Sequence, residues 1–121
     1  MLSPVVLVVE DEELISWNLE AELVEAGYTV ALARSCAEAA DFLDTHWPDV
    51  AVLDVRLSDG ECIDAAKKLY ANGVPFIVHS AFPPTDIDVA FRPGTSVSKP
   101  GGISDIVAEV TRLTASTKEP F

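Results

Sequence analysis

The feature that most constrains this chain is a set of short apolar runs that each stop at a polar residue. Residues 50–53 are Val-Ala-Val-Leu and precede Asp54, and residues 5–9 precede Glu10 and Asp11. Unbroken apolar runs of this length are typical of strands covered on both faces, as the strands of parallel sheets are. Two later strand-like segments also end at a polar residue: Phe76-Ile77-Val78-His79 precedes Ser80, and the less apolar Thr95-Ser96-Val97-Ser98 precedes Lys99.

The chain alternates such strands with segments that have a helical pattern. We predict strands at residues 5–10, 28–33, 50–54, 75–79 and 95–98. We predict helices from Glu12-Glu13 to Gly27, after Ser35, from about Glu61 to Ala71, and over residues 103–113, with residues 55–60 as a loop. Strands that alternate with helices form a parallel, doubly wound sheet with right-handed crossovers. The fold class is therefore expected to be α/β, with five parallel strands.

Local signals refine these expectations. Ser35 with Glu38 three residues later predicts a helix capping box. Residues 82–85 contain two prolines and are not expected to be helical, residues 86–91 allow at most two turns, and residues 114–121 are expected to be frayed. Trp17 is either packed in the core or exposed as a contact for a partner. The helical period predicts an apolar face on the first helix, made of Leu14, Ile15, Trp17, Leu19, Leu23 and Val24.

Composition limits the classes of function. The 121 residues are 49% apolar, so we expect one domain over residues 1–121 with a sizeable core. Eight basic residues against twenty acidic ones give a formal charge of −12, which argues against direct nucleic-acid binding and suits recruitment of a cation, or simply an acidic surface. The sequence shows no apolar run of membrane-spanning length and no signal peptide. Cys36 and Cys62 lack a metal-binding spacing and are expected to be reduced thiols of a cytoplasmic protein.

The polar residues at the strand ends predict a site. Parallel strands bring their carboxyl ends to one edge of the sheet, where open α/β sheets bind ligands. Carboxylates about 4 Å apart repel by about 4 kcal/mol per pair at an effective dielectric near 20, and Lys99 alone does not offset three of them. A hard dication does, and Mg²⁺ commonly takes one or two carboxylates with water and phosphate. Asp54 is then a candidate nucleophile for a phosphoryl group, with Ser80 and Lys99 as donors to its oxygens.

These residues resemble the motifs of response-regulator receiver domains of bacterial two-component systems. The matching segments are Val8-Val9-Glu10-Asp11-Glu12, Leu53-Asp54-Val55-Arg56-Leu57, Ser80-Ala81 and Lys99-Pro100, and the likeness covers nearly the whole chain. The resemblance implies a flavodoxin-like strand order 2-1-3-4-5 with helices on both faces. It implies that a sensor histidine kinase or phosphotransfer protein phosphorylates Asp54 and that the altered surface then binds a downstream protein. Such a domain catalyses only its own phosphorylation and dephosphorylation.

The resemblance also implies a role for each site residue. Glu10, Asp11, Asp54 and the backbone carbonyl of Arg56 would hold Mg²⁺, with Asp11 binding directly. Ser80 would be the switch residue and Lys99 the phosphate-binding lysine. The Lys99-Pro100 bond is a candidate cis peptide, which costs only about 0.5–1 kcal/mol before proline.

The chain departs from the family in its switch region. Receivers usually carry Tyr or Phe three residues before the lysine, where this chain has Ser96. Residues 73–82 resemble an atypical subgroup with a short fourth helix, many of whose members stand alone, so no output domain is expected. Phe82 is a candidate substitute for the missing aromatic.

Two other functions remain open. A pseudo-receiver would bind its partner without phosphate; the full acidic set counts against it and the missing aromatic counts for it. A phosphatase with an aspartate nucleophile usually carries a second acid two residues later, where this chain has Arg56.

Overall fold

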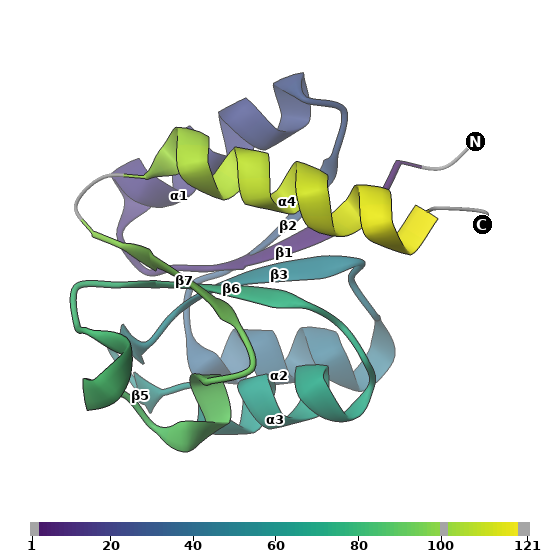
Figure 1. Ribbon diagram of the computed structural model, residues 1–121. Coiled ribbons are helices and arrows are strands. Elements are labelled where there is room, and N and C mark those ends of the chain that lie inside the picture. Colours follow the sequence, from purple (N-terminus) through teal and green to yellow (C-terminus); the bar gives the residue numbers. More distant parts are fainter. Residues whose placement is uncertain (1–2, 100–101, 119–121) are drawn as a thin grey trace.

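Five parallel strands form one sheet with helices on both faces, in a computed structural model that describes residues 3–99 and 102–118 (Figure 1). The strand order is β2-β1-β3-β6-β7, which is the flavodoxin-like order expected from the sequence. The sheet strands are β1 Val5–Val9, β2 Thr29–Ala33, β3 Val50–Asp54, β6 Phe76–Ser80 and β7 Thr95–Ser98. The helices are α1 Glu13–Glu25, α2 Cys36–Thr45, α3 Ile63–Ala71 and α4 Ile103–Lys118.

Two apolar cores lie on opposite faces of the sheet because alternate strand residues point to opposite sides. Val8, Val52 and Ile77 pack with α1 and α4 on one face. Leu53 and Val78 pack with α2 and α3 on the other. In Figure 1, α1 and α4 form the layer above the sheet, and α2 and α3 form the layer below it. Burial on both faces explains why β1 and β3 are unbroken apolar runs. Among the described residues, no helix is long and apolar enough to cross a membrane.

Three of the six residues predicted to form the apolar face of α1 do not face the core. Ser16, Leu19 and Leu23 are the buried residues of the helix. Leu14, Trp17 and Val24 are exposed instead, with Trp17 51% exposed. The two sets are each spaced by three, four or seven residues, so the helical period fits both stripes and does not say which one faces the sheet.

Several other predicted boundaries are corrected. Residues 84–86 form a 3-10 turn, because a proline in the first position of a turn has no intrahelical donor to lose. A second 3-10 turn at Val89–Phe91 agrees with the expected one or two turns. The last helix continues to Lys118, so residues 114–118 are not frayed. Thr114 lies in this extension and is buried, and its hydroxyl lies 2.8 Å from that of Tyr28, the residue before β2.

The expected loop after β3 contains a small hairpin. Its strands are β4 Arg56–Leu57 and β5 Gly60–Glu61, paired antiparallel. Gly60 has a φ of 121°, which favours glycine and closes the turn. The hairpin carries the chain from Asp54 to the start of α3.

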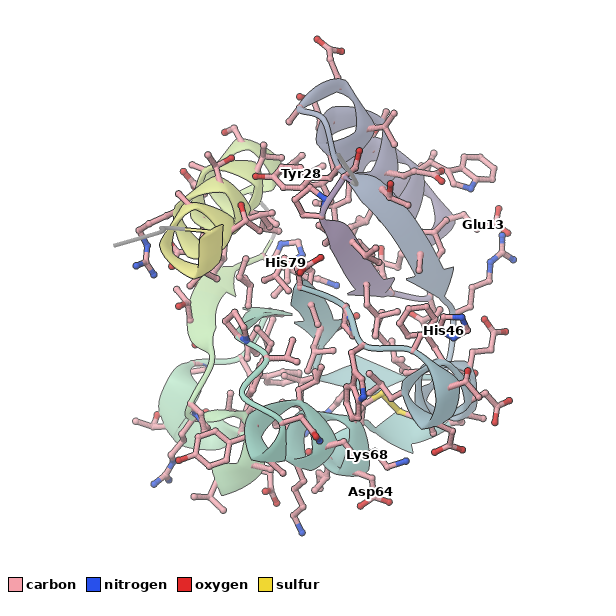
Figure 2. All side chains as sticks on the ribbon, turned by 90° about the vertical axis from the view of Figure 1, so that its right-hand side faces the viewer. Glu13, Tyr28, His46, Asp64, Lys68 and His79 are labelled. Carbon is pink, nitrogen blue, oxygen red and sulfur yellow. A yellow bond between two sulfur atoms is a disulfide. The ribbon has the colours of Figure 1, made fainter. Side chains whose placement is uncertain are left out.

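The expectation of two reduced thiols is wrong, because the structure joins Cys36 and Cys62 in a disulfide. Figure 2 shows this bond in yellow beside α2. Cys36 opens α2 and Cys62 precedes α3, and these neighbouring helices cover the same face of the sheet. The capping box is confirmed in part: the Ser35 hydroxyl accepts from the Glu38 amide at 3.0 Å, but the Glu38 carboxylate accepts from the Arg34 amide.

Replacing one leucine from each stripe of α1 tests which stripe faces the core. Leu19→Ala should lower the free energy of unfolding by about 2–5 kcal/mol, because Leu19 is fully buried. Leu14→Ala should change it by less than about 0.5 kcal/mol, because Leu14 is 73% exposed. Chemical denaturation of both variants measures the difference, and equal losses would contradict this orientation of the helix.

Candidate functional site

The carboxyl ends of four strands meet at one edge of the sheet, at the left of Figure 1. Parallel pairing sets Val9 beside Leu53, and Asp54 beside His79. It also sets Ser80 beside Ser98. The residues that end or follow these strands therefore lie side by side at the same edge of the sheet. This is the arrangement predicted from the apolar runs.

Three acids gather at this edge. One carboxylate oxygen from each of Glu10, Asp11 and Asp54 lies within 4.8 Å of the others. Glu10 is 2% exposed and Asp54 is 8% exposed, whereas Asp11 is more open to solvent. Only oxygen donors face the cluster from these side chains, and hard cations such as Mg²⁺ prefer such donors. The donor set therefore fits a divalent cation.

Lys99, which follows the edge strand β7, neutralises part of this charge. Its Nζ lies 3.0 Å from Oδ2 of Asp54 and 3.3 Å from Oε1 of Glu10. It also lies 3.5 Å from Oε1 of Glu12. Glu12 was not predicted as a site residue, because its place beside Glu13 indicated only the start of a helix. A single ammonium among three carboxylates leaves the edge of the sheet strongly negative.

Two groups at this edge of the sheet, Glu10 and Lys99, both have raised pKa values. Burial and the nearby charge of Asp54 raise the pKa of Glu10 to about 7, although Lys99 opposes the shift. For Lys99, burial alone disfavours the ammonium, but hydrogen bonding and charge from Asp54, with help from Glu10, raise its pKa. Without a metal, the Glu10 carboxyl thus keeps its proton up to near neutral pH, because its pKa is raised to about 7.

The hairpin after β3 closes one side of the site. The Ser58 amide donates to Oδ2 of Asp11 at 3.1 Å, which holds the hairpin beside the acids. Arg56, whose backbone carbonyl is the predicted fourth ligand, begins this hairpin. Its guanidinium carbon lies 4.3 Å from the ring centre of Phe82, within the range of a cation–π contact.

Ser80 ends β6 on the opposite side of the site. Its hydroxyl oxygen accepts a hydrogen bond from the Phe82 amide at 3.0 Å. The predicted switch serine therefore makes a hydrogen bond to the start of the irregular segment that follows β6. The predicted cis bond at Lys99-Pro100 lies outside the described residues.

Ser96, at the place of the missing aromatic, is exposed on β7. It borders a hollow of about 420 Å³ between β7 and the two 3-10 turns. The other residues that line the hollow are Thr85, Ile87, Phe91, Arg92 and Gly94. A small residue at this position thus leaves open space beside β7.

Comparison with known proteins places this geometry in a family. The family model of the response regulator receiver domain matches residues 6–111, a span that includes every predicted site residue. The transcriptional regulatory protein PdtaR of Mycobacterium tuberculosis is 31% identical over 119 residues, which cover 94% of this chain and 58% of that protein. The chain thus spans just over half the length of this curated relative.

Solved structures agree with the family model. The receiver domain of Francisella response regulator 1452 has a TM-score of 0.82 at 26% identity, covering 96% of this chain and 100% of that one. The response regulator TrrA of Thermotoga maritima, solved with Mg²⁺ and BeF, has a TM-score of 0.79 at 23% identity and covers 91% of this chain and 98% of its own. The chain belongs to the family of response regulator receiver domains of two-component systems.

Proposed function

We propose that this receiver domain accepts a phosphoryl group on Asp54 in a two-component phosphorelay. The observation that carries the proposal is the meeting of Glu10, Asp11 and Asp54 around the Lys99 ammonium. A carboxylate that is buried, paired with a lysine and open to a cation is suited to nucleophilic attack on phosphorus.

The transfer is a substitution at phosphorus. A carboxylate oxygen of Asp54 forms a bond to the phosphorus of a phosphohistidine, and the N–P bond breaks. The donor imidazole leaves as its neutral form after it takes up a proton. The Lys99 ammonium, now bound to Oδ2 of Asp54, then pairs with an oxygen of the bound phosphoryl group. The Ser80 hydroxyl donates to another.

Mg²⁺ fits as the cofactor of this site. Glu10, Asp11, Asp54 and the backbone carbonyl of Arg56 would hold it. When bound, the ion would neutralise charge on the phosphoryl oxygens. The complex of TrrA with Mg²⁺ and BeF supports this choice of cation.

Phosphorylation would reach the surface through Ser80. The phosphoryl group adds about 1.5–2 negative charges at the strand ends. A Ser80 hydroxyl that turns to donate to it gives up its present contact with the Phe82 amide. Converting a 1:99 population into 99:1 needs about 5.5 kcal/mol of differential stabilisation, to which the new pairing of Lys99 contributes.

The partners follow from this role. A sensor histidine kinase or phosphotransfer protein supplies the phosphoryl group in the cytoplasm, and a downstream protein binds the altered surface. The net charge of −12 disfavours nucleic acid as that partner. A phosphatase activity is disfavoured because Arg56 packs over Phe82 where a phosphatase would carry a second acid.

Removing the acceptor carboxylate tests the proposal. With Mg²⁺ and a small donor such as phosphoramidate, the protein should gain one phosphoryl group, and Asp54→Asn should gain none. Intact-protein mass spectrometry measures the modification directly.

A matched control is Asp41→Asn, which removes one acid from the exposed side of α2. This variant should be modified as fast as the unaltered protein. Modification that survives in Asp54→Asn would contradict the assignment of Asp54. An unmodified protein that still binds its partner would identify a pseudo-receiver.

Protons and Mg²⁺ should compete at Glu10. Because the pKa of Glu10 is raised to about 7 in the metal-free protein, Mg²⁺ must displace its proton at lower pH. The apparent dissociation constant should therefore rise by about tenfold per pH unit below 7 and level off above it. Calorimetric titration from pH 5.5 to 8.5 measures the profile.

Glu10→Gln tests whether Glu10 is the group at which protons compete with Mg²⁺. The variant should bind Mg²⁺ more weakly, with an affinity that is nearly constant between pH 6 and 8. A constant affinity in the unaltered protein would show that Glu10 does not control binding.

A further inference from the structure

The disulfide ties the end of the β4–β5 hairpin to the start of α2. The Cα atoms of Cys36 and Cys62 are 5.1 Å apart, although the two residues are separated by 26 positions in the sequence. The covalent ring that they close contains β3, Asp54 and the whole hairpin of β4 and β5. The cysteines are therefore linked to the candidate site through the chain itself.

Hydrogen bonds reinforce the same connection. Asp59, at the turn of the hairpin, accepts from the Cys36 amide at 2.9 Å and from the Ala37 amide at 3.1 Å. On its other side, the hairpin donates from the Ser58 amide to Asp11 at 3.1 Å. Two neighbouring residues of one turn thus join the start of α2 to an acid of the site.

Small molecules have access to the disulfide. Cys62 is 2% exposed, but Cys36 is only partly buried. Both border a surface hollow of about 430 Å³ between α2 and α3, which is large enough for a small thiol to approach Cys36. The remaining lining residues include Ala37, Ala40, Glu61 and Asp64.

We propose that Cys36 and Cys62 form a reversible redox site that controls how firmly the hairpin is held against the acids. Disulfides in cytoplasmic proteins are usually transient and redox-sensing, so the proposed location favours a reversible bond. In the reduced form, the Cys36 thiol has an acceptor in the Gly60 carbonyl, 3.6 Å from Sγ. The Asp59 hydrogen bonds can still form without the disulfide but then open more often, so reduction loosens the hairpin without unfolding it.

The exchange is balanced with a small disulfide as the oxidant. The Cys36 thiolate attacks one sulfur of that disulfide, forms a mixed disulfide and releases one thiolate. The Cys62 thiolate then attacks Sγ of Cys36 and releases the second. The two protein thiols lose two electrons, the small disulfide is reduced to two thiols, and the cysteine protons end on those thiols. Reduction is the reverse, with attack at the more accessible Cys36.

The consequence for the site rests on the proposed function, because it concerns Mg²⁺. The hairpin supplies the Arg56 carbonyl and holds Asp11, so the oxidised protein should bind Mg²⁺ about fivefold more tightly than the reduced one. By thermodynamic linkage, saturating Mg²⁺ should then raise the ratio of disulfide to dithiol at equilibrium by the same factor.

Equilibration in glutathione redox buffers, with and without Mg²⁺, tests both statements. After acid quenching and alkylation, mass spectrometry gives the fraction of protein with the disulfide. We expect a single two-electron transition that Mg²⁺ shifts about fivefold toward the disulfide. The absence of a disulfide in the oxidising buffers, or equal Mg²⁺ affinities of the two forms, would overturn the proposal.

Cys36→Ser is the matched variant, because Cys36 is the less buried partner. Its Mg²⁺ affinity should equal that of the reduced protein and should not respond to glutathione. Circular dichroism checks that the variant is folded, and the unaltered protein in its two redox states gives the same comparison without any substitution.

Hydrogen exchange separates this proposal from the proposed function. In Mg²⁺-free buffer, the amides of Cys36, Ala37 and Ser58 should exchange faster after reduction. If neither redox form binds Mg²⁺ or takes up phosphate, the proposed function fails while this difference still supports the redox site. Unchanged exchange at all three amides would overturn the redox site alone.

Discussion

The structure depends on holding like charges together at the end of a buried sheet. Glu10 and Asp54 are both nearly inaccessible to water and share one oxygen cluster with Asp11. Pairs of charges at such separations repel by about 4 kcal/mol at an effective dielectric near 20. The strands that carry them cannot separate without exposing two apolar cores, so the repulsion is relieved locally, by Lys99 and by a proton on Glu10. A site kept in this state favours any ligand that brings positive charge.

Lys99 has two roles in this balance. Its side chain is the cation that holds Asp54, and its amide donates to the Ser80 carbonyl at 2.9 Å. The lysine therefore joins Asp54, the proposed phosphoryl acceptor, to the strand that carries Ser80. A change of charge at Asp54 alters both the ion pair and the edge between β6 and β7.

The strand-end residues could be predicted from the sequence because a parallel sheet leaves them little freedom. Once residues 50–54 are a strand covered on both faces, the residue that ends it must lie at the carboxyl edge, and the same holds for Glu10, Ser80 and Lys99. Features that depend on packing between elements could not be predicted. The period of α1 fits two stripes, and 26 positions between two cysteines carry no local signal of their meeting. The hairpin at residues 56–61 is also too short to show a strand pattern.

The hairpin links the acid cluster to the disulfide, two features that the sequence did not connect. It touches Asp11 through Ser58, α2 through Asp59, and Phe82 through the Arg56 guanidinium. Phe82 in turn donates its amide to Ser80, so the switch serine and the hairpin hold the same residue from two sides. With Ser96 in place of an aromatic, β7 offers no ring to follow Ser80. The contact between Arg56 and Phe82 then supplies an aromatic ring that both the hairpin and Ser80 hold, so the proposed changes at Asp54 and at the disulfide would both act on Phe82.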